Sequence, residues 1–386
     1  MKAQARHITI RLWALLLMVG ACACNPWEQP EEEKDIPLAI FKTFWEQMDK
    51  RYTCFEEHPV NWDSIYYTNI SQVNELQNTE DLVPIFQSIM NTLKDPQLWI
   101  GVPQKASIQY RLNGSLESLG ITTPKGTDFF IDNKNNEYLP SHQIYTLRLS
   151  HKCEDKEFHF GYVSASSFRN KNATIYKPLL EQVVQLVPDG IIVDLRYNDE
   201  GEFLTMTEFV RQFFEGNRPI LYTAQRESEE NRYNMTHPKP YSIIGEGTVP
   251  DSIPIIIIVN FLTIGPANVC AYILQALPNT IIIGQTTTSG GGSSVSGVSL
   301  THDWALHFSN DAKYYVNWHS CESPLRLNVV VSESSAIYEE YIIDGHKEVL
   351  FIDSSIATAI NLLESMKPTI DSPPLGTFDA TGRKAE

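Results

Sequence analysis

The stretch Ile255–Gly292, IIIIVNFLTIGPANVCAYILQALPNTIIIGQTTTSGGG, decides the fold of this chain. Its first five residues are all β-branched, which indicates a strand buried on both faces. Pro266 stands where a helix accepts proline in its first turn, and Pro278 predicts the end of that helix. The run Ile281–Ile283 predicts a second buried strand before a glycine-rich turn. Such a β-α-β unit is often a plain structural crossover, but in α/β enzymes its sharp turn can hold a nucleophile or an oxyanion hole.

Two motifs in the chain resemble peptidase family S41, the tail-specific and tricorn-core serine proteases. The first, VNFLTIGPAN followed by IIIGQTTTSGGG, is similar to the segment around the family's nucleophile. The second, GIIVDLRYNDEG at Gly190–Gly201, resembles the family's loop G-x-I-x-DLR-x-N-x-GG. The matching positions of the first motif are Val259, Asn260, Thr263, Ala267, Gly284, Thr286 and 290–292.

The resemblance implies an α/β fold with a crotonase- and ClpP-like core behind an N-terminal helical bundle. We expect no PDZ module, because residues 101–159 are too few for a full one and contain no Gly-Leu-Gly-Phe-like loop. The strands through Ile192 and Val259 are predicted to be central in one sheet, since each is an uninterrupted apolar run followed by a turn and a helical pattern.

The residues that perform peptide hydrolysis in the family are replaced in this chain. Gly265 stands at the nucleophile position and Gln97 at that of the base histidine. His319 takes the place of the catalytic glutamate, with Glu322 as an off-register candidate, and Gly290 takes that of the lysine in the Ser-Lys version. Glycine has no side chain, and an amide cannot accept and return a proton near neutral pH. The sequence therefore predicts a loss of catalysis.

The resemblance also implies a loop that carries oxyanion donors and contacts substrate. We assign to it Arg196, Asn198, Glu200, Gly201 and Pro266. Glu200 occupies a glycine position of the family motif. A carboxylate beside an oxyanion hole opposes the negative charge that develops there, because like charges repel strongly in a poorly solvated site.

Three functions remain open at this point. We favour a catalytically inactive homologue that binds a peptide or an unfolded polypeptide segment. Binding would use the cleft that holds substrate in the family, through backbone hydrogen bonds to a strand edge. The second is an active serine-type peptidase with a relocated nucleophile, namely Thr263, Ser289 or Ser293. The third is a crotonase-like acyl-ester or thioester site built from backbone donors, although the chain has no basic phosphate cradle for coenzyme A. No cofactor and no metal ion is expected.

The N-terminus has the order of a bacterial lipoprotein signal. A basic region precedes the apolar residues 12–19, and the following Gly20-Ala21-Cys22 resembles a lipobox with Cys22 as the lipidated residue. Cleavage before Cys24 or an ordinary signal peptide are the alternatives. Acyl chains would anchor the protein to a membrane without spanning it. We expect an outer-membrane lipoprotein of the bacterial envelope, facing the periplasm or the surface.

The net charge of the chain argues against two classes of binding partner. The chain has 386 residues and a net charge of −17, which argues against nucleic acid and against electrostatic attraction to anionic membranes. The expected organisation is a signal peptide over residues 1–21, an acidic lipidated tether over 22–36, a helical domain over 37–100, a β-rich connecting segment over 101–159, an S41-like α/β core over 160–366 and a disordered tail over 367–386.

Overall fold

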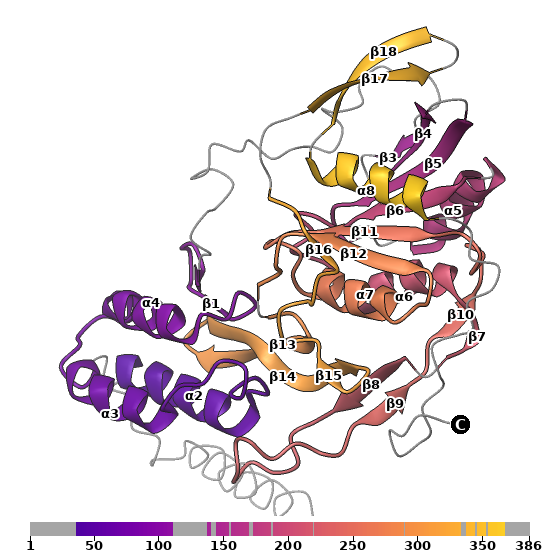
Figure 1. Cartoon of the computed structure of the whole chain (residues 1–386). Helices are drawn as coiled ribbons and strands as arrows, with labels where there is room; N and C mark the ends of the chain where they lie inside the picture. The colour runs from indigo at the N-terminus through magenta and orange to yellow at the C-terminus, as the bar shows by residue number, and fades with distance from the viewer. Residues whose placement is uncertain are drawn as a thin grey trace, which may run out of the picture.

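The computed structural model describes two packed units, an α/β unit and a unit of helices on a second sheet (Figure 1). The predictions for residues 1–36 and 367–386, including Cys22, lie outside the described residues apart from residue 36. The described residues are 36–110, 137–139, 144–153, 156–169, 173–186, 188–218, 220–288, 290–332, 337–343, 346–352 and 354–366.

The α/β unit is built on a seven-stranded sheet of order β16-β12-β11-β6-β5-β4-β3. Its central strands β6 and β11 are parallel, with Ile192 opposite Ile256, and both are buried at every residue. The prediction that the runs through Ile192 and Val259 share the centre of one sheet is therefore confirmed. The strands are β3 (Glu137–Leu139), β4 (Ile144–Cys153), β5 (Lys156–Ala165), β6 (Gly190–Asp194), β11 (Ile255–Val259), β12 (Thr280–Gly284) and β16 (Val329–Val330).

Helices cover both faces of this sheet (Figure 1). Alternate residues of β11 explain why: Ile255, Ile257 and Val259 join the core on the side of α5, α6 and α7, whereas Ile256 and Ile258 join the core beneath α8. A strand whose successive side chains point to opposite, equally buried faces needs apolar residues throughout. The helices are α5 (Tyr176–Gln185), α6 (Phe203–Val210), α7 (Pro266–Gln275) and α8 (Ser354–Ser365).

The N-terminal unit differs from the predicted helical domain because its core is shared with strands from much later in the chain. Leu300, Trp304, Leu306 and Phe308 pack among the apolar side chains of the helices. A helix must bury its apolar stripe against another element, and here the element is a sheet. The helices are α2 (Ile36–Arg51), α3 (Trp62–Val73), η2 (Thr79–Asp81) and α4 (Leu82–Leu93).

This second sheet has the order β2-β1-β14-β8-β9, with β13 and β15 also paired to β14. Its strands are β1 (Trp99–Gly101), β2 (Ile108–Gln109), β8 (Leu221–Ala224), β9 (Lys239–Tyr241), β13 (Ser293–Thr301), β14 (Trp304–Val316) and β15 (His319–Ser320). The predicted connecting segment, 101–159, thus contributes β2 and the last residue of β1 to this sheet, and β3, β4 and the start of β5 to the other. The remaining elements are η4 (Ala173–Ile175), η5 (Arg211–Phe213), β7 (Glu215–Asn217), β10 (Ile244–Glu246), β17 (Ile337–Ile343) and β18 (His346–Ile352).

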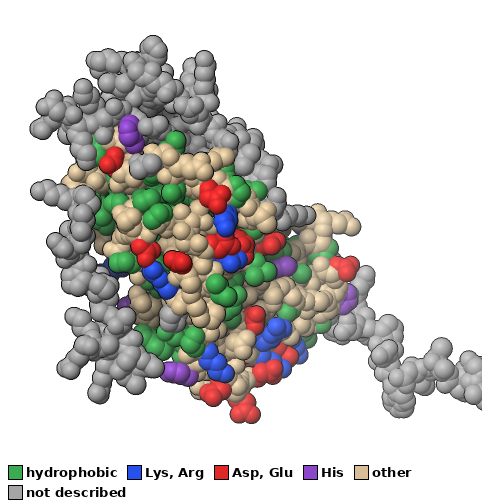
Figure 2. Space-filling view, turned by 90° about the vertical axis from the view of Figure 1, so that its right-hand side faces the viewer, with side chains coloured by type: hydrophobic (Ala, Val, Ile, Leu, Met, Phe, Trp, Pro, Cys, Tyr) green, Lys and Arg blue, Asp and Glu red, His purple; other side chains and the backbone are tan. Residues whose placement is uncertain are grey.

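The surface mixes both signs of charge. Figure 2 shows a face on which acidic and basic side chains lie among one another. Glu246, for example, pairs with Lys177 at 3.2 Å and with Arg211 at 3.3 Å. Exposed pairs of this kind contribute little to stability. Among the residues that the structure describes, no helix has the length and apolarity needed to cross a bilayer.

Candidate functional site

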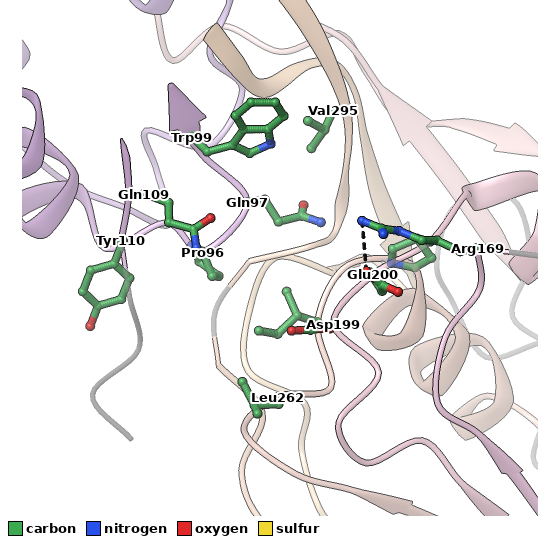
Figure 3. Close-up of a pocket in the computed structure, with 13 residues that line it drawn as sticks. Pro96, Gln97, Trp99, Gln109, Tyr110, Arg169, Asp199, Glu200, Leu262 and Val295 are labelled. Carbon is green, nitrogen blue, oxygen red and sulfur yellow. Dashed lines mark ion pairs between the residues drawn. The ribbon is translucent and has the colours of Figure 1, made fainter. Parts of the chain in front are cut away.

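A cleft lies where the loop after α4 meets the loops that follow β6 and β11 (Figure 3). It consists of a cavity of about 620 Å³ and an adjoining cavity of about 270 Å³. The two share Gln97, Gly201, Pro266 and Val295 in their walls. Ligands of open α/β sheets bind outside the carboxyl ends of the strands, and this cleft has that position.

Gly265 forms the sharp turn into α7 and lies against Gln97. Its backbone has φ of 64° and ψ of −135°, a conformation that strains any residue with a Cβ atom and suits glycine. In α/β hydrolases a comparable strained turn between strand and helix exposes the nucleophile. A Cβ atom added to Gly265 would lie 2.8 Å from Gln97 Nε2. The structure therefore brings together the two positions that sequence reasoning assigned to nucleophile and base.

Buried hydrogen bonds join the loops after β6 and β11. The Ile264 N–H donates to the Asn198 carbonyl at 3.0 Å. The Thr263 hydroxyl donates to the Leu195 carbonyl at 3.0 Å and accepts from the Asn260 N–H at 3.0 Å. Because the Thr263 side chain is buried and its hydroxyl is occupied in both roles, Thr263 is a structural residue of the turn.

Only part of the predicted substrate loop reaches the cleft. Glu200, Gly201 and Pro266 line it. Arg196 instead donates to the Asp194 carboxylate, with Nη2 at 2.7 Å from Oδ2. Asn198 is fully buried and its Nδ2 donates to the Ala165 carbonyl at 2.9 Å. Arg196 and Asn198 therefore hold the loop in place and do not line either cavity.

The charge of Glu200 is paired within the cleft wall. Its carboxylate accepts from the Ser167 hydroxyl at 3.2 Å and lies 3.0 Å from Arg169 Nη2, the ion pair drawn in Figure 3. Burial and, second, the charge of Glu200 raise the pKa of the neighbouring Asp199 carboxyl. Gly201 has φ of 139°, and a Cβ atom there would lie 2.5 Å from the Phe168 backbone. This glycine is required by close packing of the loop.

The structure places Glu322, and not His319, beside the glycine turn. His319 belongs to the edge strand β15, opposite Val316, and its side chain is exposed. Glu322 is only 1% exposed, and its carbonyl accepts from the Gly290 N–H at 3.0 Å. The assignment of His319 to the position of the family glutamate stays a prediction. Asn317 and Trp318 both have positive φ and form the turn between β14 and β15.

The carboxyl of Glu322 lies in an acidic, buried environment. Burial, followed by the charge of Asp95, raises its pKa, while a hydrogen bond from Ser293 acts in the opposite direction. Asp95 itself accepts from the Tyr52 hydroxyl at 2.7 Å and from the Gln97 N–H at 2.8 Å. Asp95 and Tyr52 were missed from the sequence, although Asp95 stands only two residues before Gln97.

Ser293, one of the candidate relocated nucleophiles, is 6% exposed. Its Oγ lies 3.4 Å from Cys54 Sγ, and burial raises the pKa of the Cys54 thiol well above its ordinary value. Thiols kept protonated in this way are poor nucleophiles and poor bases. Ser289, the third candidate, lies outside the described residues.

The structure is an α/β fold whose cleft has Gly265 at the sharp turn into α7. Residues 159–323 match the sequence model of Peptidase family S41. Over this stretch the chain is similar to the S41 peptidases.

One relative of known sequence matches a short stretch of the chain. The carboxy-terminal processing protease CtpB of Bacillus subtilis (strain 168) is 26% identical over 85 residues, which are 22% of this chain and 18% of that protein. The chain thus matches less than a fifth of the length of this relative.

The structure is similar to three solved structures. A candidate peptidase from Parabacteroides merdae has a TM-score of 0.67 at 19% identity, over 87% of this chain and 99% of that chain. Mature CPAF complexed with lactacystin has a TM-score of 0.57 at 10% identity, over 76% and 94%. A lipoprotein from Streptococcus agalactiae has a TM-score of 0.50 at 13% identity, over 88% and 99%. At these identities the likeness shows the fold alone.

Proposed function

We propose that this protein is a catalytically inactive S41-family protein that binds extended polypeptide in the cleft at Gln97. The observation that carries the proposal is the close approach of Gly265 and Gln97. A Cβ atom added to Gly265 would lie 2.8 Å from Gln97 Nε2. Acyl transfer needs a nucleophile and a base in contact. The position for the nucleophile has no side chain, and the position for the base has an amide.

The oxyanion side of the cleft supports the same function. The residue after a nucleophile at such a turn normally contributes its backbone N–H to the oxyanion hole. Here that residue is Pro266, which has no N–H. A tetrahedral intermediate would therefore lack one donor at the start of α7, and loss of a single donor typically costs about 10²–10³ in kcat.

A relocated nucleophile is less well supported. The Thr263 hydroxyl is used inside the loop. Ser293 has a carboxyl neighbour, Glu322, and burial raises the pKa of that carboxyl. Ser293 itself is 6% exposed and its Oγ lies 3.4 Å from Cys54 Sγ, so its hydroxyl is packed among other side chains.

Peptide binding without hydrolysis needs a strand edge beside the cleft. Within the described residues β13 pairs with β14 alone, so one edge of β13 is unpaired. Its first residues, Ser293, Ser294 and Val295, line the smaller cavity. An extended peptide can add to such an edge through backbone hydrogen bonds.

The proposal includes the cellular setting predicted from the sequence. The mature protein starts at a lipidated Cys22 and is held at the outer membrane of the bacterial envelope by its acyl chains. Support comes from the order of basic, apolar and small residues before Cys22. The ligand is then a peptide or an unfolded segment present in that compartment.

The test combines hydrolysis and binding on the full chain in detergent. We expect no new peptide termini by mass spectrometry after incubation with unfolded casein, and no labelling by a serine-directed fluorophosphonate. We expect binding to members of an array of overlapping casein peptides. Labelling that is abolished by Ser293→Ala would show a relocated nucleophile and overturn the proposed inactivity. An array without any binding peptide would overturn the proposed peptide binding.

A further inference from the structure

Gln97 is fixed at its backbone and unsatisfied at its side chain. Its N–H donates to Asp95 Oδ1 at 2.8 Å, and Asp95, which is 2% exposed, is held in turn by the Tyr52 hydroxyl. The carboxamide is different. Its Oε1 is buried without a hydrogen-bond partner, and within the described part of the chain no residue pairs with its Nε2. A fixed backbone with an unpaired buried acceptor is costly unless water or a ligand supplies the partner.

The same side chain stands at the junction of the two cavities. Gln97 lines both of them, together with Gly201 and Pro266. Figure 3 shows its carboxamide reaching into the space between Val295 and Asp199. Gly265 has no side chain that could cover this carboxamide, so a ligand backbone can approach it closely.

The chemistry of the carboxamide matches that of a peptide group. It presents one acceptor oxygen and an NH₂ donor, and a turn about its last bond exchanges their positions. A peptide group presents one N–H and one C=O. A histidine at this position would exchange protons with a substrate, whereas glutamine can form a donor-acceptor pair with an intact peptide bond.

We infer that the Gln97 carboxamide anchors one peptide group of the bound chain, with Oε1 accepting its N–H and Nε2 donating to a carbonyl. The polypeptide then passes from the larger cavity to the smaller one across Gly265. This inference rests on the proposed function and deepens it, because it names the group that the cleft recognises. The site selects backbone amides, and the ligand class is an extended polypeptide with an unmodified N–H at the anchored position.

The test uses backbone N-methylation of a peptide probe. The tightest-binding member of the casein array is resynthesised with one N-methyl group at each amide in turn, and each version is titrated against the full chain in detergent. We expect one position at which N-methylation weakens binding about tenfold, the effect of leaving one acceptor unpaired. In Gln97→Ala the same N-methyl group should change the Kd less than about twofold, because the acceptor is already gone.

Two further variants separate anchoring from a structural effect. Gln109→Ala removes another glutamine of the same cavity and should leave the N-methyl pattern unchanged. Gln97→Glu keeps the acceptor and should keep the sensitive position, although binding weakens through loss of the donor. Circular dichroism checks that each variant is folded.

The outcomes distinguish the two proposals. If no array peptide binds, the proposed function fails and the anchor fails with it. If a peptide binds and the sensitive position is the same in the wild type and in Gln97→Ala, the anchor is overturned while peptide binding stands. Loss of the sensitive position in Gln97→Ala alone supports the anchor.

Discussion

At the scale of single residues, the cleft is built around a sharp glycine turn and a neighbouring glutamine. Gly265 has the strained conformation at the start of α7, and Gln97 lies against it. Asp95 and Glu322 are buried behind them. Gly265 and Gln97 were identified by their places in short sequence motifs. Glu322 was named only as an off-register candidate beside His319, because motif spacing alone does not fix the alignment after the turn at 317–318.

The first prediction concerns strain at the turn. Gly265→Ser should lower the free energy of unfolding by about 1–3 kcal/mol, because a Cβ atom is unfavourable at positive φ and would contact Gln97. Urea unfolding measures the change. Gly216→Ser is the matched control, since Gly216 has φ of 71° and a Cβ atom there would meet nothing within 4 Å. If both substitutions cost the same, the contact with Gln97 contributes nothing.

A second prediction concerns pH. Burial raises the folded-state pKa of Glu322 above its ordinary value of 4.5, so the folded protein binds this proton more tightly than the unfolded chain does. Stability from this group is therefore lost as the pH rises from about 4.5 through the folded-state pKa. Glu322→Gln should remove that loss, so its unfolding midpoint in urea should gain on the wild type as the pH is raised.

One control variant and one contrary outcome test this prediction. Glu181→Gln, at an exposed site of α5, should follow the pH dependence of the wild type. A Glu322→Gln variant whose midpoint parallels the wild type at every pH from 4 to 8 would show that the Glu322 pKa is not raised.

At the scale of elements, the local sequence pattern predicted individual strands and helices but not which strands pair. The five β-branched residues of β11 identify a doubly buried strand, and Pro266 marks the first residue of α7. The second sheet was not predicted, because its pairs join distant segments such as Trp99 with His307. Alternation of apolar residues gives the face of a strand and says nothing about its partner. Hence the helices were assigned to a domain of their own.

The shared core gives the third prediction. Leu306→Ala should cost about 2–5 kcal/mol, because Leu306 is fully buried between β14 and the helices. Backbone hydrogen exchange should also become faster in α2 and α4, because their apolar faces lose packing contacts with the Leu306 side chain. Val330→Ala, at a side chain that is 72% exposed, should change stability by less than about 0.5 kcal/mol. Unchanged exchange in the helices of Leu306→Ala would mean that they are stable without the sheet.

At the scale of the whole molecule, the cleft lies where the two units meet. The two units meet at Gln97, which the N-terminal unit supplies, and at Gly265, which the α/β unit supplies. The proposed loss of hydrolysis is compatible with an intact fold, because Gln97 and Gly265 lie outside the apolar core clusters.

The last prediction concerns how the molecule is held at the membrane. Lipid on Cys22 adds apolar surface worth about 0.8 kcal/mol per buried CH₂ group, and more than one acyl chain is needed for stable anchoring. Cys22→Ser removes the thiol that carries the lipid, so the protein should move from the detergent phase to the aqueous phase in Triton X-114 partitioning. Cys24→Ser should stay in the detergent phase, because it leaves the predicted acceptor intact. The reverse result would assign the lipid to Cys24, and a detergent-phase protein in both single variants and in the double variant would exclude a lipid anchor at either cysteine.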